Sequence, residues 1–198
     1  DVFLIKTDSQ GNEEWKKTLR TDWGGGISVY QTTDDGYIII SNKRYDSFND
    51  YAELIKTDSQ GNEEWNKEFR AGPPLQLSAS LKTDDGGYII IGRVVDPNNS
   101  NPKVWINKVD ENGDEQWLVD SQRGTVHSIQ KTLDGGYIMV GQIRATPSGG
   151  YASEEVLIIK IDSQGVEEWT KVLSGGDLGA TKYYKDDRGV SIHQTEDG

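Results

Sequence analysis

The twelve-residue stretch LIKTDSQGNEEW occurs twice, letter for letter, at residues 4–15 and 54–65. It returns in altered form as INKVDENGDEQW at 106–117 and as IIKIDSQGVEEW at 158–169. A second motif alternates with it, as QTTDDGYIII, KTDDGGYIII and KTLDGGYIMV, and once in the shortened form QTEDG. Two motifs that alternate at a step of about fifty residues along nearly the whole chain predict a fold built from repeats.

Each motif predicts a β-hairpin. In the first motif the polar turn at residues 8–12 separates two extended runs, and Gly11 supplies the positive φ that such a turn needs. In the second motif an Asp-Gly turn precedes Tyr-Ile-Ile-Ile, a strongly β-prone run. No segment shows the period of a helix. Four short strands in each repeat predict an all-β chain, a β-propeller of four-stranded antiparallel blades.

The phase of the motifs divides a single propeller domain, residues 1–198, into three complete and two partial blades. The complete blades are expected at 27–70, 77–119 and 126–173, and the partial ones at 1–20 and 190–198. Because the first residues, DVFLIK, read as mid-strand without a Met, we expect a processed chain or a fragment. A second copy or a continuation of the chain would supply the remaining blades. One tryptophan per repeat is expected to dock each blade on its neighbour, namely Trp15, Trp65, Trp117 and Trp169.

The alternation of KTDSQGNEEW with DGGYII resembles the secreted β-propeller repeats of bacterial and archaeal surface proteins. The resemblance covers nearly all of the chain and implies a large extracellular protein. The spacing of Asp8, Gly11 and Trp15 is also similar to the tryptophan-docking repeat of quinoprotein dehydrogenases, in which Asp and Gly lie one residue further apart. The Asp-box of sialidase-like propellers matches less well, because it places Asp and Gly two residues apart.

Charge and composition exclude several classes of partner. The net charge of -12 disfavours nucleic acid, which needs a basic face, and also disfavours anionic membrane surfaces. The absence of cysteine excludes disulfides, thiol catalysis and cysteine-based metal sites. No apolar run reaches the 18 or so residues of a membrane-spanning helix. We expect an acidic extracellular or cell-surface protein.

The connections between the hairpins differ from repeat to repeat, and such variable loops on a constant scaffold commonly carry function. They combine aromatic rings, which stack on sugars or anchor protein partners, with carboxylates that accept hydrogen bonds. The segment 174–189 departs most from the repeat and is the first candidate. The candidate ligand-binding residues are Trp23, Tyr45, Phe48, Tyr151, Tyr183, Tyr184, Asp186 and Asp187.

Chemistry at the ring axis has few candidates. Gln130 and His193 fall on predicted inner strands, and His127, the second of the two histidines, just precedes one. No catalytic or cofactor motif is present, and a metal is expected only as Ca²⁺ at acidic loops such as DENGD at 110–114. The lysine that recurs in each repeat is expected to pair with carboxylates, at Lys6, Lys56, Lys108 and Lys160.

These observations favour a non-enzymatic extracellular propeller that acts as a structural, adhesive or assembly module through its variable loop face. Its partners are expected to be a cell-surface protein or glycan, or a second copy of the chain. Two alternatives remain open: a carbohydrate-binding propeller, and a propeller hydrolase or lyase that acts on polysaccharide or a quinoprotein-like oxidoreductase. An enzyme would need a concentrated polar site at the axis, from residues such as Lys82, Gln130, Lys131 and His193.

Overall fold

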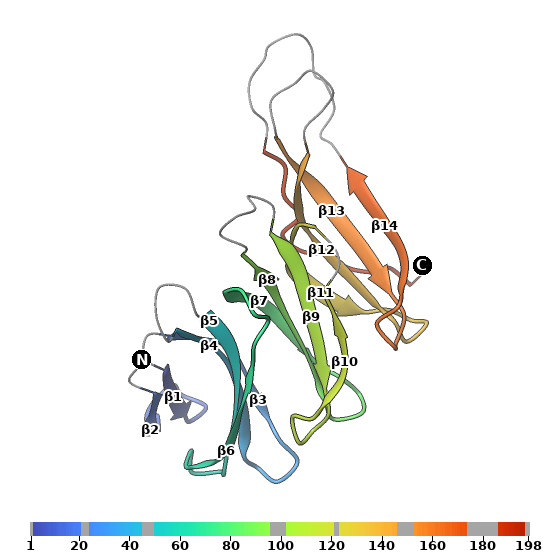
Figure 1. The fold of residues 1–198 in the computed structure, drawn as a ribbon. Coiled ribbons are helices and arrows are strands. Elements are labelled where there is room, and N and C mark those ends of the chain that lie inside the picture. Colours follow the sequence, from blue (N-terminus) through green and yellow to red (C-terminus); the bar gives the residue numbers. More distant parts are fainter. Residues whose placement is uncertain are drawn as a thin grey trace.

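The computed structural model describes residues 2–20, 24–44, 50–95, 102–120, 123–145, 153–173 and 186–196. This part of the chain contains fourteen antiparallel strands in four sheets and no helix, which confirms the predicted all-β class. The four sheets follow one another in chain order as a row, from the N-terminal sheet to the C-terminal one (Figure 1). The predicted meander of four antiparallel strands is present in three of them.

The first sheet has two strands, β1 (Val2–Thr7) and β2 (Glu13–Arg20). The second contains β3 (Gly24–Gln31), β4 (Tyr37–Arg44), β5 (Asp50–Thr57) and β6 (Glu63–Phe69). The third contains β7 (Leu75–Lys82), β8 (Tyr88–Val94), β9 (Lys103–Val109) and β10 (Glu115–Val119). The fourth contains β11 (Thr125–Lys131), β12 (Tyr137–Ala145), β13 (Ser153–Ile161) and β14 (Glu167–Leu173).

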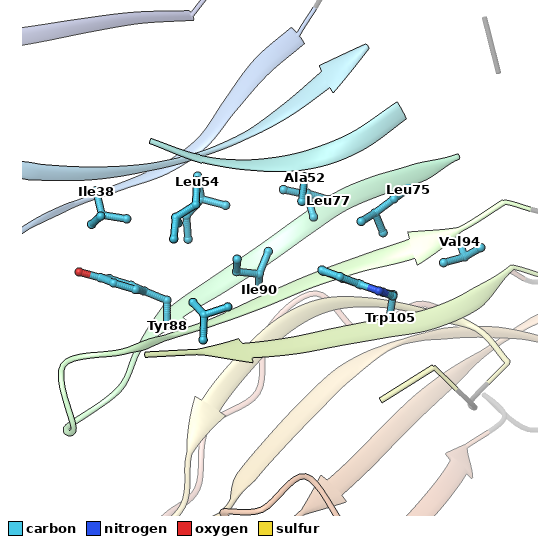
Figure 2. Close-up of a cluster of buried hydrophobic side chains, with 11 residues drawn as sticks. Ile38, Ala52, Leu54, Leu75, Leu77, Tyr88, Ile90, Val94 and Trp105 are labelled. Atoms are coloured by element: carbon cyan, nitrogen blue, oxygen red, sulfur yellow. The ribbon is translucent and has the colours of Figure 1, made fainter. Parts of the chain in front are cut away.

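The Tyr-Ile-Ile-Ile strands bury both of their faces, because a sheet packs on each side of them. In β4, Ile38 and Ile40 contact the third sheet, whereas Ile39 contacts the first sheet. In β8, Ile90 points back toward the second sheet, while its neighbours on either side point toward the fourth. Figure 2 shows the layer between the second and third sheets, where Ile38 and the other side chains of the second sheet face those of the third. Every such side chain removed from water stabilises the stack by about 1.5–3 kcal/mol.

The tryptophans of β2, β6 and β10 each pack on the hairpin glycine of the next sheet, whereas Trp169 of β14, for which docking is also predicted, meets no hairpin glycine among the described residues. A methyl group added at Gly61 would lie 2.8 Å from the ring of Trp15, and one at Gly165 would lie 2.7 Å from that of Trp117. The indole N–H of Trp117 also donates to the carbonyl of Ser163 in the same turn, at 3.3 Å. Trp15, Trp65 and Trp117 are half-buried at these contacts, as the docking prediction requires.

The hairpin turn that receives the indole is held by its own aspartate. In the second repeat the Oδ1 of Asp58 accepts the backbone N–H groups of Gln60 and Asn62, at 2.9 and 2.8 Å. Gly61 then takes a φ of 78°, a conformation that residues with a Cβ adopt only with strain. The Asp-x-x-Gly spacing therefore fixes the turn, and the missing Cβ opens the surface on which the indole packs.

The repeated lysine of the third strand lies beneath carboxylates, which confirms the predicted pairing. Lys56 is almost fully buried, and its Nζ donates to Asp34 at 2.8 Å and to Glu64 at 2.9 Å. Burial lowers the pKa of Lys56, but these two hydrogen bonds outweigh burial and raise it, and the hydrogen bond from Lys56 lowers the pKa of Asp34. The same arrangement recurs at Lys108 with Asp85 and Gln116, at Lys160 with Asp134 and Glu168, and in shorter form at Lys6 with Glu14.

Residues 186–196 form no strand, although the repeat predicts the first strand of a further blade at 190–198. In the three larger sheets the first strand pairs with the Tyr-Ile-Ile-Ile segment that follows it. None of the described residues pairs with 190–196 in this way. The segment nevertheless lies beside β11, where Gln194 accepts the N–H of Leu133 at 2.8 Å.

Replacing a hairpin glycine that receives an indole should destabilise the fold more than replacing one that does not. Gly61→Ala adds both positive-φ strain and a clash with Trp15, whereas Gly135→Ala adds the strain alone, because nothing lies within 4 Å of its Cβ position. We expect the free energy of unfolding to fall by about 1–3 kcal/mol more for Gly61→Ala. Urea denaturation of the two variants measures the difference, and equal losses would contradict the docking role of the glycine.

Acid should weaken the fold through the aspartates that the lysines hold. Burial raises the pKa of Asp85, but the hydrogen bonds from Lys108 and the Thr83 hydroxyl lower it from 3.8 to about 2. A depressed carboxyl pKa stabilises the fold above pH 3.8, and this contribution is lost as the pH falls toward 2. Because the Asp85 carboxylate is 55% exposed, the loss is at most about 1 kcal/mol.

The variant Asp85→Asn cannot titrate, so its free energy of unfolding should change less between pH 4 and pH 2 than that of the parent. Lys108→Met, which removes the donor, should flatten the same interval. Chemical denaturation at a series of pH values measures both effects. Parallel pH profiles for the parent and the Asn variant would show that Asp85 does not contribute.

Candidate functional site

The two ends of the stacked sheets differ in character. The Asp-Gly turns between first and second strands and the Asp-x-x-Gly turns between third and fourth strands lie at one end, since the strands run antiparallel. The connections that vary between repeats therefore lie at the opposite end. This end corresponds to the predicted loop face, and a cavity opens there among the described residues.

The cavity has a volume of about 170 Å³ and lies at the strand ends between the third and fourth sheets. Arg93 comes from the end of β8, Arg123 precedes β11, and Arg144 comes from the end of β12. Glu154 at the start of β13 is the one acidic side chain of the described lining. We call this feature the arginine cavity; it concentrates positive charge on a chain whose net charge is -12.

The three guanidinium groups are held to different degrees. Arg93 donates through two nitrogens to the Oε1 of Gln76, at 2.9 and 2.7 Å, which fixes its plane. Arg123 and Arg144 are exposed, and no described carboxylate forms an ion pair with either of them. Two guanidinium groups that form no ion pair with a described carboxylate, beside a third that is held in place, can accept a planar anion such as a carboxylate.

Asp186 and Asp187 are the two predicted ligand-binding residues of the loop face that the structure describes, and both lie against Glu154. The Oδ1 of Asp186 accepts the backbone N–H of Glu154 at 3.2 Å, and the backbone N–H of Asp187 donates to the carbonyl of Glu154 at 2.7 Å. Both residues therefore lie at the margin of the arginine cavity. The other predicted loop residues lie outside the described residues: Trp23, Tyr45, Phe48, Tyr151, Tyr183 and Tyr184.

A second hollow, of about 270 Å³, follows the first strands of the three larger sheets, β3, β7 and β11. Hydroxyl groups dominate its lining: the Oγ of Ser80 lies 2.5 Å from that of Ser28 and 2.8 Å from the hydroxyl of Tyr30. The Oγ of Ser78 is buried there and has no hydrogen-bond partner in the described part of the chain. We call this feature the inner hollow.

The structure brings the predicted axis residues Gln130 and His193 together, since the Nδ1 of His193 lies 3.0 Å from the Oε1 of Gln130. His127 lines the inner hollow, and its Nε2 lies 3.2 Å from the Oε1 of Gln142. The two histidines thus each pair with a glutamine. The lysines of the enzymatic alternative also have partners, Lys82 at the carbonyl of Gln31 and Lys131 at Asp84.

No cluster of three or more His, Asp or Glu side chains in the described ranges is arranged to hold a metal ion. In the acidic stretch 110–114, Asp110 accepts the backbone N–H groups of Asn112 and Asp114, at 2.9 and 2.8 Å. Asp114 in turn pairs with Lys67 of the preceding sheet. Ca²⁺ at acidic loops stays a prediction.

Comparison with protein-family models and with curated proteins finds no match. Across the described ranges there is also no helix with the length and apolar character needed to cross a bilayer. The arginine cavity is therefore assigned as the candidate site from its residues and geometry alone.

Sequence reasoning missed the arginine cavity because its three arginines are far apart along the chain and occupy no common position of the repeat. Arg93 takes the position held by Asn42 and Gln142 in the neighbouring repeats. The sequence did contain a signal, because at such positions near the strand ends one repeat carries a charge and its neighbours do not. Only the stacking of the third and fourth sheets shows that these positions meet.

Proposed function

We propose that the four sheets are consecutive blades of a β-propeller. Three repeated features support this: the apolar layers between successive sheets, the indole on each following hairpin, and the adjacent first strands around the inner hollow. Residues 186–196 continue the same step, because His193 meets Gln130, its counterpart one repeat earlier. Strands that stack in this way around a common axis are the basis of a propeller.

The proposed function is that of a non-enzymatic structural, adhesive or assembly module of an extracellular or cell-surface protein, which binds an acidic partner at its loop face. The observation that carries the proposal is the arginine cavity. Long-range repulsion from the net charge of -12 is screened beyond about 8–10 Å at physiological salt, so the nearby guanidinium groups determine what binds there. A carboxylate is the group that matches their planar donors.

A carbohydrate partner is the second candidate, and the same cavity favours it in the form of an acidic polysaccharide. A volume of about 170 Å³ admits a single carboxylate-bearing sugar unit rather than a folded segment of protein. The inner hollow adds hydroxyl groups, which are suited to sugar hydroxyls, on the neighbouring strands. A polysaccharide-active enzyme would use the same surfaces, with chemistry at the inner hollow.

Titration calorimetry with polygalacturonate, with poly-glutamate and with a neutral polysaccharide tests the proposal. We expect an acidic polymer to bind, and Arg123→Gln and Arg144→Gln each to weaken its binding by about tenfold or more, since each loses a charge-assisted hydrogen bond. Arg44→Gln is the matched control, because Arg44 occupies the repeat position of Arg144 but is paired with Asp50 at 2.9 Å.

Binding of the acidic sugar polymer but not of poly-glutamate would select the carbohydrate partner, and the reverse would select a protein. Equal binding of the neutral polymer, or a loss of affinity in Arg44→Gln as large as in Arg144→Gln, would contradict the arginine cavity as the site. Thermal denaturation of the arginine variants provides the folding control. Exposed arginines without an ion pair should change the free energy of unfolding by no more than about 0.5 kcal/mol.

A further inference from the structure

Trp169 differs from the other three repeat tryptophans because it packs on no hairpin glycine of the described residues. Trp15, Trp65 and Trp117 each contact the glycine of the following sheet, whereas β14 belongs to the last of the four sheets. The Trp169 side chain is accordingly 39% exposed. It presents to solvent the surface that the other three bury.

The sheet face around Trp169 is apolar and incompletely covered. Ile138, Val156 and Ile158 occupy the positions that are fully buried in the second sheet, and each of them is only partly buried. Residues 186–196 cover part of this face near the first strand, where Gly189 contacts Val140. Asp186 and Asp187 lie against the start of β13 at Glu154, and none of the other described residues packs over the rest of β13 and β14 on this face. We call this region over β13 and β14 the leading face.

At the opposite end of the row, the first sheet has a hairpin glycine that no described indole contacts. Gly11, in the first hairpin, has nothing within 4 Å of its Cβ position, whereas Gly61 and Gly165 each lie against an indole. Phe3 and Ile5, on the side of β1 that points away from the second sheet, are 48% and 51% exposed. We call this surface the trailing face: a hairpin turn without its indole, beside two apolar side chains without a covering sheet.

The internal interfaces also share a polar contact, whose lysine lies on the leading side and whose acceptor lies in the following hairpin. At the two ends of the row these two partners are separated. Two residues after the tryptophan, Lys17 donates to Asn62 at 2.9 Å and Lys67 to Asp114 at 2.6 Å, each in the following hairpin. Lys171 occupies the same place after Trp169, and its Nζ already lies 5.6 Å from the centre of that ring, as Lys67 does with Trp65. Its counterpart in the first hairpin would be Asn12.

We propose that the leading face of one copy binds the trailing face of a second copy, with Trp169 on Gly11 and Lys171 beside Asn12. The interface repeats one that the chain already makes three times between its own sheets. Because it joins two different surfaces, it is a head-to-tail interface, which extends to further copies until a ring closes. Residues 190–196 follow the line of a first strand, whereas β1 and β2 correspond to a third and a fourth, and residues 186–189 contact β12 and β13 away from Trp169 and Lys171.

Sedimentation velocity of the 198-residue protein over a wide concentration range tests the proposal. We expect the average mass to rise with concentration for the parent. Trp169→Ala and Gly11→Ala should each stay monomeric, since the first removes the indole and the second places a methyl group on the surface where the indole would pack. Gly135→Ala is the matched control: it has the same backbone conformation as Gly11, with φ of 86° and 87°, and an equally open Cβ position, and it should associate like the parent.

Mixing the two monomeric variants distinguishes head-to-tail from symmetric pairing. Trp169→Ala keeps an intact trailing face and Gly11→Ala an intact leading face, so the mixture should form dimers and nothing larger. A parent that is monomeric at every concentration would overturn the proposal. So would a Gly11→Ala variant that associates as the parent does. None of the arginines takes part, so either result leaves the proposed binding at the arginine cavity untouched.

Discussion

The packing of an indole on a glycine of the next sheet is the contact on which the arrangement of this molecule depends. The sheets bury their Tyr-Ile-Ile-Ile strands on both faces, and this burial requires a neighbour on each side at a fixed separation. The indole can approach the following hairpin closely only where no Cβ intervenes. The aspartate that closes the turn and the glycine that ends it therefore serve the contact between sheets as much as the hairpin itself.

Each internal interface consists of one surface that projects an indole and another that receives it. A row of such sheets has two unlike ends, whatever its length. In this chain Trp169 is exposed at one end and the turn at Gly11 is open at the other. The asymmetry is a property of the repeat, because every sheet faces its predecessor with a hairpin and its successor with a tryptophan.

The positions that repeat and the positions that vary serve different purposes at the two ends of the strands. The buried lysines and their carboxylates recur at the end with constant turns, where they compensate one another's charge. At the other end Arg93, Arg123 and Arg144 come together with Glu154 as the one carboxylate of the described lining. Exposed arginines such as Arg123 and Arg144 contribute little to stability, so the meeting of the three at variable positions makes the arginine cavity the better candidate for binding.

The sequence by itself determined the strands of the four sheets, the two kinds of turn, three of the four predicted tryptophan contacts and the lysine pairs, because each depends on residues close in the chain or on a motif repeated at a constant step. It also singled out Gln130 and His193, which lie one repeat apart on equivalent positions and do meet. The tertiary structure alone decided that three arginines from different repeats line one cavity. It also decided that residues 190–196 form no strand, since a strand needs a ladder partner and none of the described residues provides one. Non-repeated residues meet only through the packing of whole sheets, and no local pattern records that packing.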